Sequence, residues 1–171
     1  MAFWSRPSMV LTVLAIAALG TLWSSAARAG EEVVYRKMPW MTRCELDDKT
    51  RERNCSIWRS LASPALKTEN PNRLVLVINA VDDYAFVQTA PFAPASIAID
   101  GNPALPFDQC LAPTMCMLEP GMASDLRRQL ESGGEMRLSF RDKDGGTTTV
   151  AYDLADYPSA AAAAKQWLSQ P

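Results

Sequence analysis

Four cysteines are the residues of this sequence whose type and spacing most readily support covalent chemistry. Ten residues separate Cys44 from Cys55, and five separate Cys110 from Cys116. Paired zinc ligands usually lie two to four residues apart, and redox-active pairs normally use Cys-x-x-Cys, so neither chemistry fits this spacing. Structural disulfides fit better, and four cysteines permit three pairings. We favour the local pairing, Cys44–Cys55 and Cys110–Cys116, because short loops close most readily.

Histidine is absent from the chain, which has 19 acidic residues. Its absence excludes Ser-His-Asp and Cys-His nucleophile systems, His-ligated zinc hydrolases and haem held by histidine. Carboxylate-pair chemistry stays open, although the sequence does not tell which acids share a cleft. Asp142-Lys143-Asp144 resembles the start of a calcium loop, but Gly146 and Thr147 stand where Asp or Asn and then Gly are needed, so a hairpin turn is favoured. We predict no catalytic residue, no cofactor and no metal ligand.

The N-terminal segment has the three-part pattern of a secretory signal peptide. Arg6 supplies a positive charge, residues 9–23 are almost entirely apolar, and Ala27-Arg28-Ala29 forms a small-x-small cleavage pattern. The apolar stretch is shorter than the roughly 20 residues that a spanning helix needs, which disfavours the alternative of an uncleaved anchor. We therefore predict a cleaved signal peptide at residues 1–29 and a single mature domain at residues 30–171, with no integral membrane span.

The charge of the chain bears on the partners it can bind, and its cysteines bear on the cellular compartment in which it resides. With 17 basic and 19 acidic residues the chain is mildly acidic, and removal of Arg6 and Arg28 makes the mature part more so. An acidic surface repels phosphate backbones, so a nucleic-acid partner is disfavoured. Disulfides persist in oxidising compartments. Together with the predicted signal peptide they favour export, into the periplasm, into the medium or to the outer membrane; a Gram-negative bacterium as the source is what the family resemblance described below implies.

Hydrophobic patterning predicts a mainly β domain. Residues 73–80 contain a continuous run of β-branched and leucine residues, typical of a strand buried on both faces. About nine short strands, with turn residues every 8–12 positions, favour an antiparallel sandwich. Other segments alternate apolar and polar residues as half-buried strands do: 40–44, 55–61, 96–100, 135–140 and 147–154.

One or two short helices are also expected. Met122, Leu126 and Leu130 recur every four residues, with Ser124 or Asp125 as the cap and Gly133-Gly134 as the end. A second helix starts near Pro158 and carries five alanines, whose small face suits close packing on a sheet. Two large side chains are expected in the core by default: Trp58 and Trp167.

The order and spacing of several motifs resemble a known family. The motifs are Trp40-Met41-Thr42-Arg43-Cys44, Cys55, Ile99-Asp100-Gly101-Asn102, Pro106-Phe107-Asp108-Gln109-Cys110 and Cys116. Across roughly residues 35–168 the chain is similar to the invasion-associated locus B family of bacterial exported proteins. Residues 90–94 and 153–157 depart from the family's usual turn motifs. The resemblance implies an immunoglobulin-like β-sandwich, export, and a link to host-cell entry or envelope maintenance, without catalytic residues.

Three functional hypotheses follow. The leading one is a non-enzymatic exported envelope protein, periplasmic, that supports envelope integrity or host interaction through a protein or envelope component. The second is a surface-exposed virulence factor that aids host-cell attachment through a host-cell surface partner, and it rests on the family resemblance alone. The third is a carboxylate-dependent envelope enzyme, for which the sequence offers only the presence of acidic residues.

Overall fold

The structure is a computed structural model and describes residues 30–63, 74–89, 95–141 and 145–170. The expected signal peptide, the divergent residues 90–94 and the turn residues Asp142 to Asp144 lie outside the described residues. Within the described part, no helix is long and apolar enough to cross a membrane.

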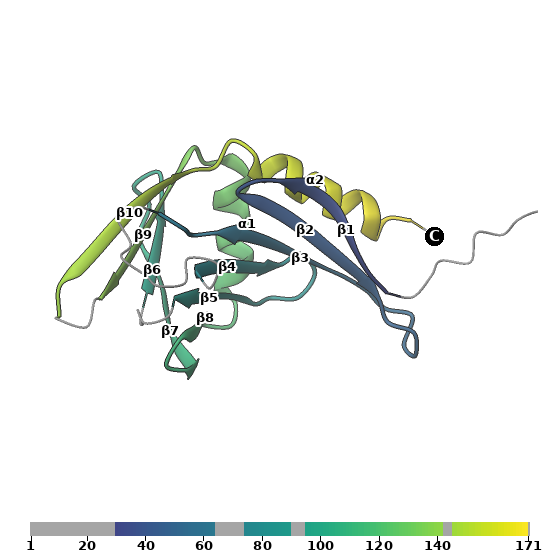
Figure 1. Ribbon diagram of the computed structural model, residues 1–171, viewed down its shortest axis with the longest axis horizontal. Helices are drawn as coiled ribbons and strands as arrows, with labels where there is room; N and C mark the ends of the chain where they lie inside the picture. Colours follow the sequence, from purple (N-terminus) through teal and green to yellow (C-terminus); the bar gives the residue numbers. More distant parts are fainter. Residues whose placement is uncertain (1–29, 64–73, 90–94, 142–144, 171) are drawn as a thin grey trace, which may run out of the picture.

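Ten strands and two helices make up the described domain (Figure 1). They are β1 (Gly30–Lys37), β2 (Trp40–Leu46), β3 (Arg53–Ser60), β4 (Leu74–Asn79), β5 (Ala85–Thr89), β6 (Ala95–Ile99), β7 (Leu105–Ala112), β8 (Met115–Leu118), α1 (Met122–Ser132), β9 (Glu135–Arg141), β10 (Thr147–Asp153) and α2 (Tyr157–Leu168). The expected mainly β character and both expected helices are therefore confirmed.

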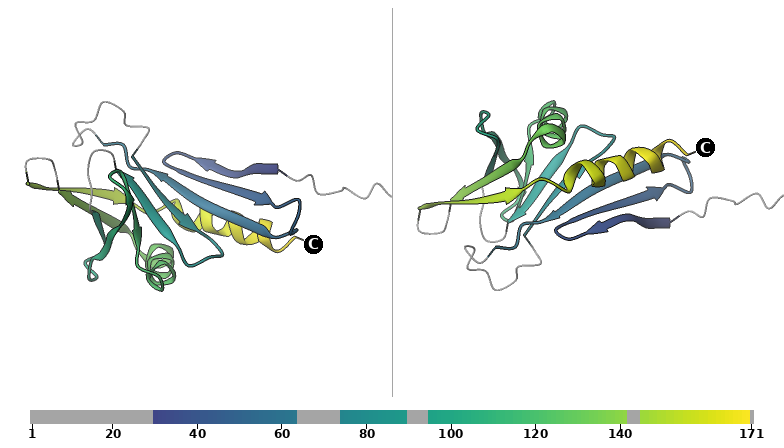
Figure 2. Two further views of the ribbon diagram at one scale, coloured as in Figure 1. Left: turned by 90° about the horizontal axis from the view of Figure 1, so that it is seen from below. Right: turned by 90° about the horizontal axis from the view of Figure 1, so that it is seen from above.

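All strands belong to one antiparallel sheet with the order β1-β2-β3-β4-β5-β8-β7-β6-β9-β10. The sheet curls strongly, and both helices lie on the same side of it (Figure 2). This curl gives the sandwich-like, disulfide-stapled arrangement expected from the sequence, but its two halves are joined by hydrogen bonds between β5 and β8. We call the side that carries the helices the inner face and the opposite side the outer face.

The core fills the inner face of the sheet. Alternate residues of the strands, such as Ile57 on β3 and Leu76 on β4, pack there against Leu126 and Leu130 of α1. These side chains are almost completely removed from solvent. Full burial of each such leucine or isoleucine stabilises the fold by about 1.5–3 kcal/mol.

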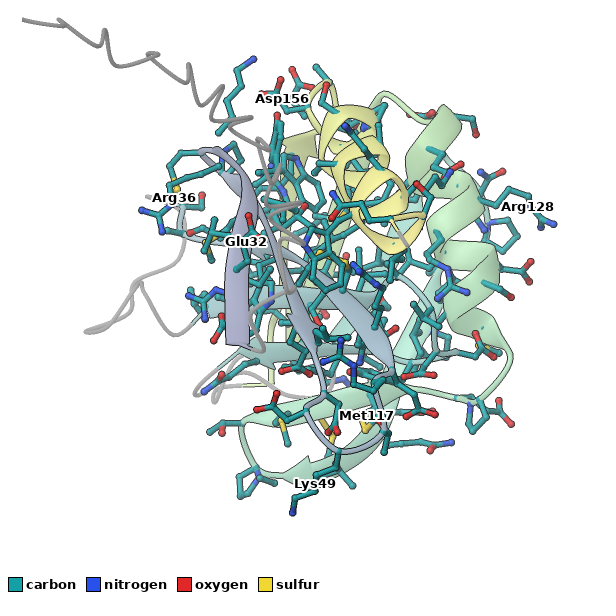
Figure 3. The ribbon with its side chains drawn as sticks, turned by 90° about the vertical axis from the view of Figure 1, so that its right-hand side faces the viewer. Glu32, Arg36, Lys49, Met117, Arg128 and Asp156 are labelled. Atoms are coloured by element: carbon teal, nitrogen blue, oxygen red, sulfur yellow. A yellow bond between two sulfur atoms is a disulfide. The ribbon has the colours of Figure 1, made fainter. Side chains whose placement is uncertain are left out.

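Helix α2 packs on the first three strands through its small residues, as the alanine run predicted. Ala160 and Ala164 are fully buried, and the hydroxyl of Thr42 on β2 donates a 2.9 Å hydrogen bond to the carbonyl oxygen of Ala160. Trp167 is buried, as expected, and its indole nitrogen donates to a carboxylate oxygen of Glu32 at 3.1 Å. Figure 3 shows α2 beside the β1 strand that carries Glu32.

The start of α1 differs from the prediction. Neither Ser124 nor Asp125 caps the helix: its N-cap is Gly121, whose φ of 95° lies in the left-handed region that favours glycine. The Ser124 hydroxyl donates to the Gly121 carbonyl oxygen instead. Asp83, from the turn between β4 and β5, accepts the Ser124 N–H at 2.9 Å and so acts as a distant cap. Gly133 ends the helix, as predicted.

Candidate binding surface

An apolar row crosses the outer face of five neighbouring strands. Strand pairing places Met41 opposite Trp58, Trp58 opposite Val77, Val77 opposite Phe86, and Phe86 opposite Met117. Cross-strand neighbours lie within side-chain contact, so the row is continuous. We call these residues the outer row: Met41, Trp58, Val77, Phe86 and Met117.

Burial along the outer row is graded. Val77, at its centre, is only 1% exposed although it belongs to neither core cluster of the inner face. The remaining members are half-buried and keep part of their surface in contact with solvent. Trp58 was expected in the core and instead lies on this outer face, half-buried. Tryptophan, phenylalanine and methionine are enriched at protein interfaces, so the composition of the row suits a binding surface.

A hollow of about 210 Å³ adjoins the outer row at Trp58. Arg43 stands in it, with its guanidinium 5.0 Å from the centre of the Trp58 ring and 3.0 Å from a carboxylate oxygen of Glu31. Within the described part of the chain, Trp58 Nε1 and Arg43 Nε are buried without a hydrogen-bond partner. An ion pair and two donors that lack a partner thus lie together beside the hollow. The hollow is lined by Glu31, Arg43, Cys44, Glu45, Asn54, Ser56 and Trp58.

The cysteines form the disulfides expected from local pairing. Cys44 and Cys55 lie directly opposite one another on β2 and β3, and Cys110 and Cys116 do the same on β7 and β8. The first bridge is buried beneath α2 and next to the hollow. It therefore fixes the register of the two strands that present Arg43 and Trp58.

Arg59 is a residue whose role the sequence did not reveal. It is 4% exposed on the inner face, with its guanidinium 5.1 Å from the Trp40 ring centre and 4.7 Å from that of Tyr152. It donates to the carbonyl oxygen of Asp153 at 3.3 Å. Burial lowers the pKa of Arg59, while nearby Tyr152 and Asp153 raise it. The contacts join β3 to β10, so we assign Arg59 a structural role.

Outside the hollow, local hydrogen bonds and ion pairs shift the pKa values of several ionisable groups. The pKa of Asp47 is lowered by N–H groups of its own turn, those of Thr50 and Lys49. The pKa of Lys37 is raised by its ion pair with Asp156. Among the described residues, no cluster of three or more histidine, cysteine, aspartate or glutamate side chains could hold a metal ion. These shifts therefore indicate turns and surface pairs, and no pair of carboxylates among them points to general acid–base work.

Comparison with known proteins decides the family. Residues 40–165 match the family model described as Invasion associated locus B (IalB) protein. The chain belongs to this family. Among solved structures, the crystal structure of invasion associated protein b from Bartonella henselae aligns with 77% of this chain and 95% of that chain, at 10% sequence identity and a TM-score of 0.48. No curated protein sequence matches the chain.

The structure gives one motif of this IalB family member a physical role. Asp100, in the turn after β6, has a φ of 46° and accepts the backbone N–H groups of Gly134 and Glu135 at 2.9 Å each. These two hydrogen bonds lower the pKa of its carboxyl. The Asp-Gly turn thus ties the β6–β7 connection to the segment that follows α1. The match to the IalB family begins at Trp40, so Glu31 of the hollow lies outside it.

Proposed function

We propose that this chain is a non-enzymatic exported protein of the Gram-negative cell envelope. It resides in the periplasm and supports envelope integrity or host interaction by binding a protein or another envelope component. The signal-like N-terminus, the two disulfides and membership of the invasion-associated locus B family support this proposal. The outer row is the observation that carries it, because four of its five members keep part of an apolar side chain exposed on a disulfide-braced sheet.

The physical case for binding rests on rigidity and composition. The outer row stands on paired strands, so its side chains are already ordered, and binding costs little additional conformational entropy. The guanidinium of Arg43 lies over the ring of Trp58, the second member of the row. Tryptophan and arginine are over-represented among the residues that dominate binding energy. Trp58 is therefore the residue expected to contribute most to the interface.

Site-specific photocrosslinking in living cells tests the proposed surface. A photoreactive residue replaces Phe86 in the outer row or, as the control, Arg128, which extends into solvent from α1 (Figure 3). We expect a discrete adduct from position 86, none from position 128, and loss of the adduct when Trp58→Ala is added. Equal adducts from both positions, or none from position 86, would contradict the proposal.

Protease treatment of intact cells tests the compartment separately. A periplasmic protein survives together with a periplasmic marker, and mass analysis should show residues 1–29 missing and both disulfides intact. Digestion of the protein while the marker survives would contradict periplasmic residence and favour the surface-exposed alternative.

A further inference from the structure

The two edges of the sheet are protected to different degrees. Strand β1 has a register shift between Val33 and Tyr35 and four charged residues in eight, features that block pairing with another strand. Strand β10 pairs with β9 over seven residues without a register shift. Along residues 147–151 it has no charged residue and no proline. In Figure 1, β10 lies at the outer margin of the sheet.

Hydrogen bonds at the end of β10 identify which backbone groups face the open edge. The N–H of Leu154 donates to the carbonyl oxygen of Gly134 at 3.0 Å, one step beyond the β9–β10 ladder. Hydrogen-bonded pairs alternate along an antiparallel ladder, so the even-numbered residues of β10 bond to β9. The odd-numbered residues direct their N–H and C=O groups away from β9. Three of these are exposed: Thr147, Thr149 and Ala151.

The usable edge ends at Ala151. The carbonyl oxygen of the next odd-numbered residue, Asp153, accepts a hydrogen bond from Arg59 where the sheet curls back toward β3. The Thr149 hydroxyl shares a 2.8 Å hydrogen bond with that of Ser139 on β9. Among the described residues, no backbone hydrogen bond joins Thr147, Thr149 or Ala151 to a residue outside the β9–β10 ladder. The five residues 147–151 therefore form a short, uncharged template for one more strand.

We propose that residues 147–151 of β10 pair antiparallel with the same residues of a second copy of the chain. The twofold axis passes through Thr149, so Thr149 faces Thr149 of the second copy and Thr147 faces Ala151 of the second copy. Each facing pair exchanges two backbone hydrogen bonds in this register. The match is self-complementary because the segment has no charge that a twofold axis would set against itself. In this register Val150 faces Thr148 of the second copy.

The contact is small, so the dimer is weak and concentration-dependent. Five residues from each copy bury less than the roughly 1,200 Å² typical of stable interfaces. The dimer uses the β10 edge and leaves the outer row free, so it does not depend on the proposed function. Purified protein alone suffices to test it.

Amide hydrogen exchange measured by NMR tests the pairing residue by residue. The purified protein is compared at about 10 µM and about 1 mM, which bracket a weak dimer. We expect the N–H groups of Thr147, Thr149 and Ala151 to exchange at least about tenfold more slowly at the higher concentration. The N–H groups of Thr148 and Val150, already bonded to β9, should change little. Unchanged exchange at the three outward amides, or concentration-dependent protection on β1 or the outer row instead, overturns the proposal.

Sedimentation velocity of three variants at position 149 tests the dimer, two of them disruptive and one a matched control. Thr149→Pro removes an outward N–H without breaking the bonds to β9, and Thr149→Lys sets two like charges opposite each other. Both should weaken dimerisation at least about tenfold. Thr149→Val keeps the backbone donor and the strand preference, so it should dimerise like the unchanged protein. Equal dimerisation by all three variants, or a monomer at about 1 mM for the unchanged protein, overturns the proposal.

Discussion

Tyr152 donates a 2.8 Å hydrogen bond from its phenol to the carbonyl oxygen of Leu61, a residue 91 positions earlier in the chain. Tyr152 lies on the edge strand β10 and Leu61 directly follows β3, so the bond joins distant parts of the curled sheet. Arg59 lies over the ring of Tyr152 at the same place. Both bonded residues are buried. The curl is therefore fixed by a side chain as well as by the backbone ladder.

This contact predicts a loss of stability at alkaline pH. Burial raises the pKa of Tyr152 to about 12, although nearby Arg59 lowers it. An unfolded tyrosine titrates near pH 10, so between about pH 10 and pH 12 the unfolded state releases a proton that the folded state retains. The free energy of unfolding should therefore fall as pH rises through this range, by up to roughly 2–3 kcal/mol from this group. Urea unfolding from about pH 8 to about pH 11 measures the fall.

Tyr152→Phe separates the two contributions of this residue. At neutral pH the variant should lose about 1–2 kcal/mol, because the Leu61 carbonyl keeps no phenol donor. Above about pH 10 it should lose less stability per pH unit than the unchanged protein, since one titrating phenol is gone. The remaining slope includes Tyr157, whose pKa burial also raises. An identical alkaline slope in both proteins would show that Tyr152 does not carry the effect.

The sequence predicted elements better than it predicted contacts between them. Alternating residues and turn signals located the strands, because a half-buried strand imposes a period of two wherever it lies. It did not reveal Arg59 as an inner-face residue, because a charged side chain in such a pattern is normally assigned to solvent. Its burial is made favourable by the ring of Trp40 on the neighbouring strand and by two partners from a distant segment, the ring of Tyr152 and the carbonyl oxygen of Asp153. The sequence did not reveal the outer row either, because its five residues become neighbours only through the register of five strands.

The small face of α2 predicts a strong contrast between neighbouring alanines. Ala164 is fully buried against the Cys44–Cys55 bridge, whereas Ala162 is exposed. Ala164→Leu inserts a larger side chain into this contact and should destabilise the protein by about 1–3 kcal/mol. Ala162→Leu adds the same atoms on the solvent side and should change stability by less than about 0.5 kcal/mol. Thermal unfolding of the two variants should differ clearly, and similar midpoints would argue against tight packing of α2.

Different burial of the two bridges predicts the order in which they are reduced. Cys44 and Cys55 are each 1% exposed, while Cys110 lies on the surface. Attack by a thiolate needs access to a sulfur atom, so a mild reductant should open Cys110–Cys116 first in the folded protein. Mass analysis after alkylation of the released thiols measures the order. Simultaneous loss of both bridges under native conditions would contradict this assignment.

Removal of the buried bridge should also affect stability. Cys44→Ser should lower the free energy of unfolding by about 2–5 kcal/mol, because it breaks the crosslink and leaves a hydroxyl beneath α2. The Cys110–Cys116 bridge closes a shorter loop, with a sequence separation of 6 against 11 for Cys44–Cys55. Cys110→Ser should therefore lower the free energy of unfolding by less. Urea unfolding compares the two variants. An unchanged midpoint for Cys44→Ser would mean that the β2–β3 hairpin does not depend on its disulfide.

The cap that Asp83 supplies to α1 predicts that this residue, from the β4–β5 turn, stabilises the helix more than Asp125 in the helix's own first turn. Asp83→Ala leaves the Ser124 N–H without its acceptor and removes a negative charge near the positive end of the helix. We expect a loss of about 1 kcal/mol. Asp125→Ala, in the first turn, removes a surface ion pair with Arg128 and should cost at most about 0.5 kcal/mol. If urea unfolding showed the larger loss for Asp125→Ala, the helix would be stabilised by its own first turn and not by the β4–β5 turn.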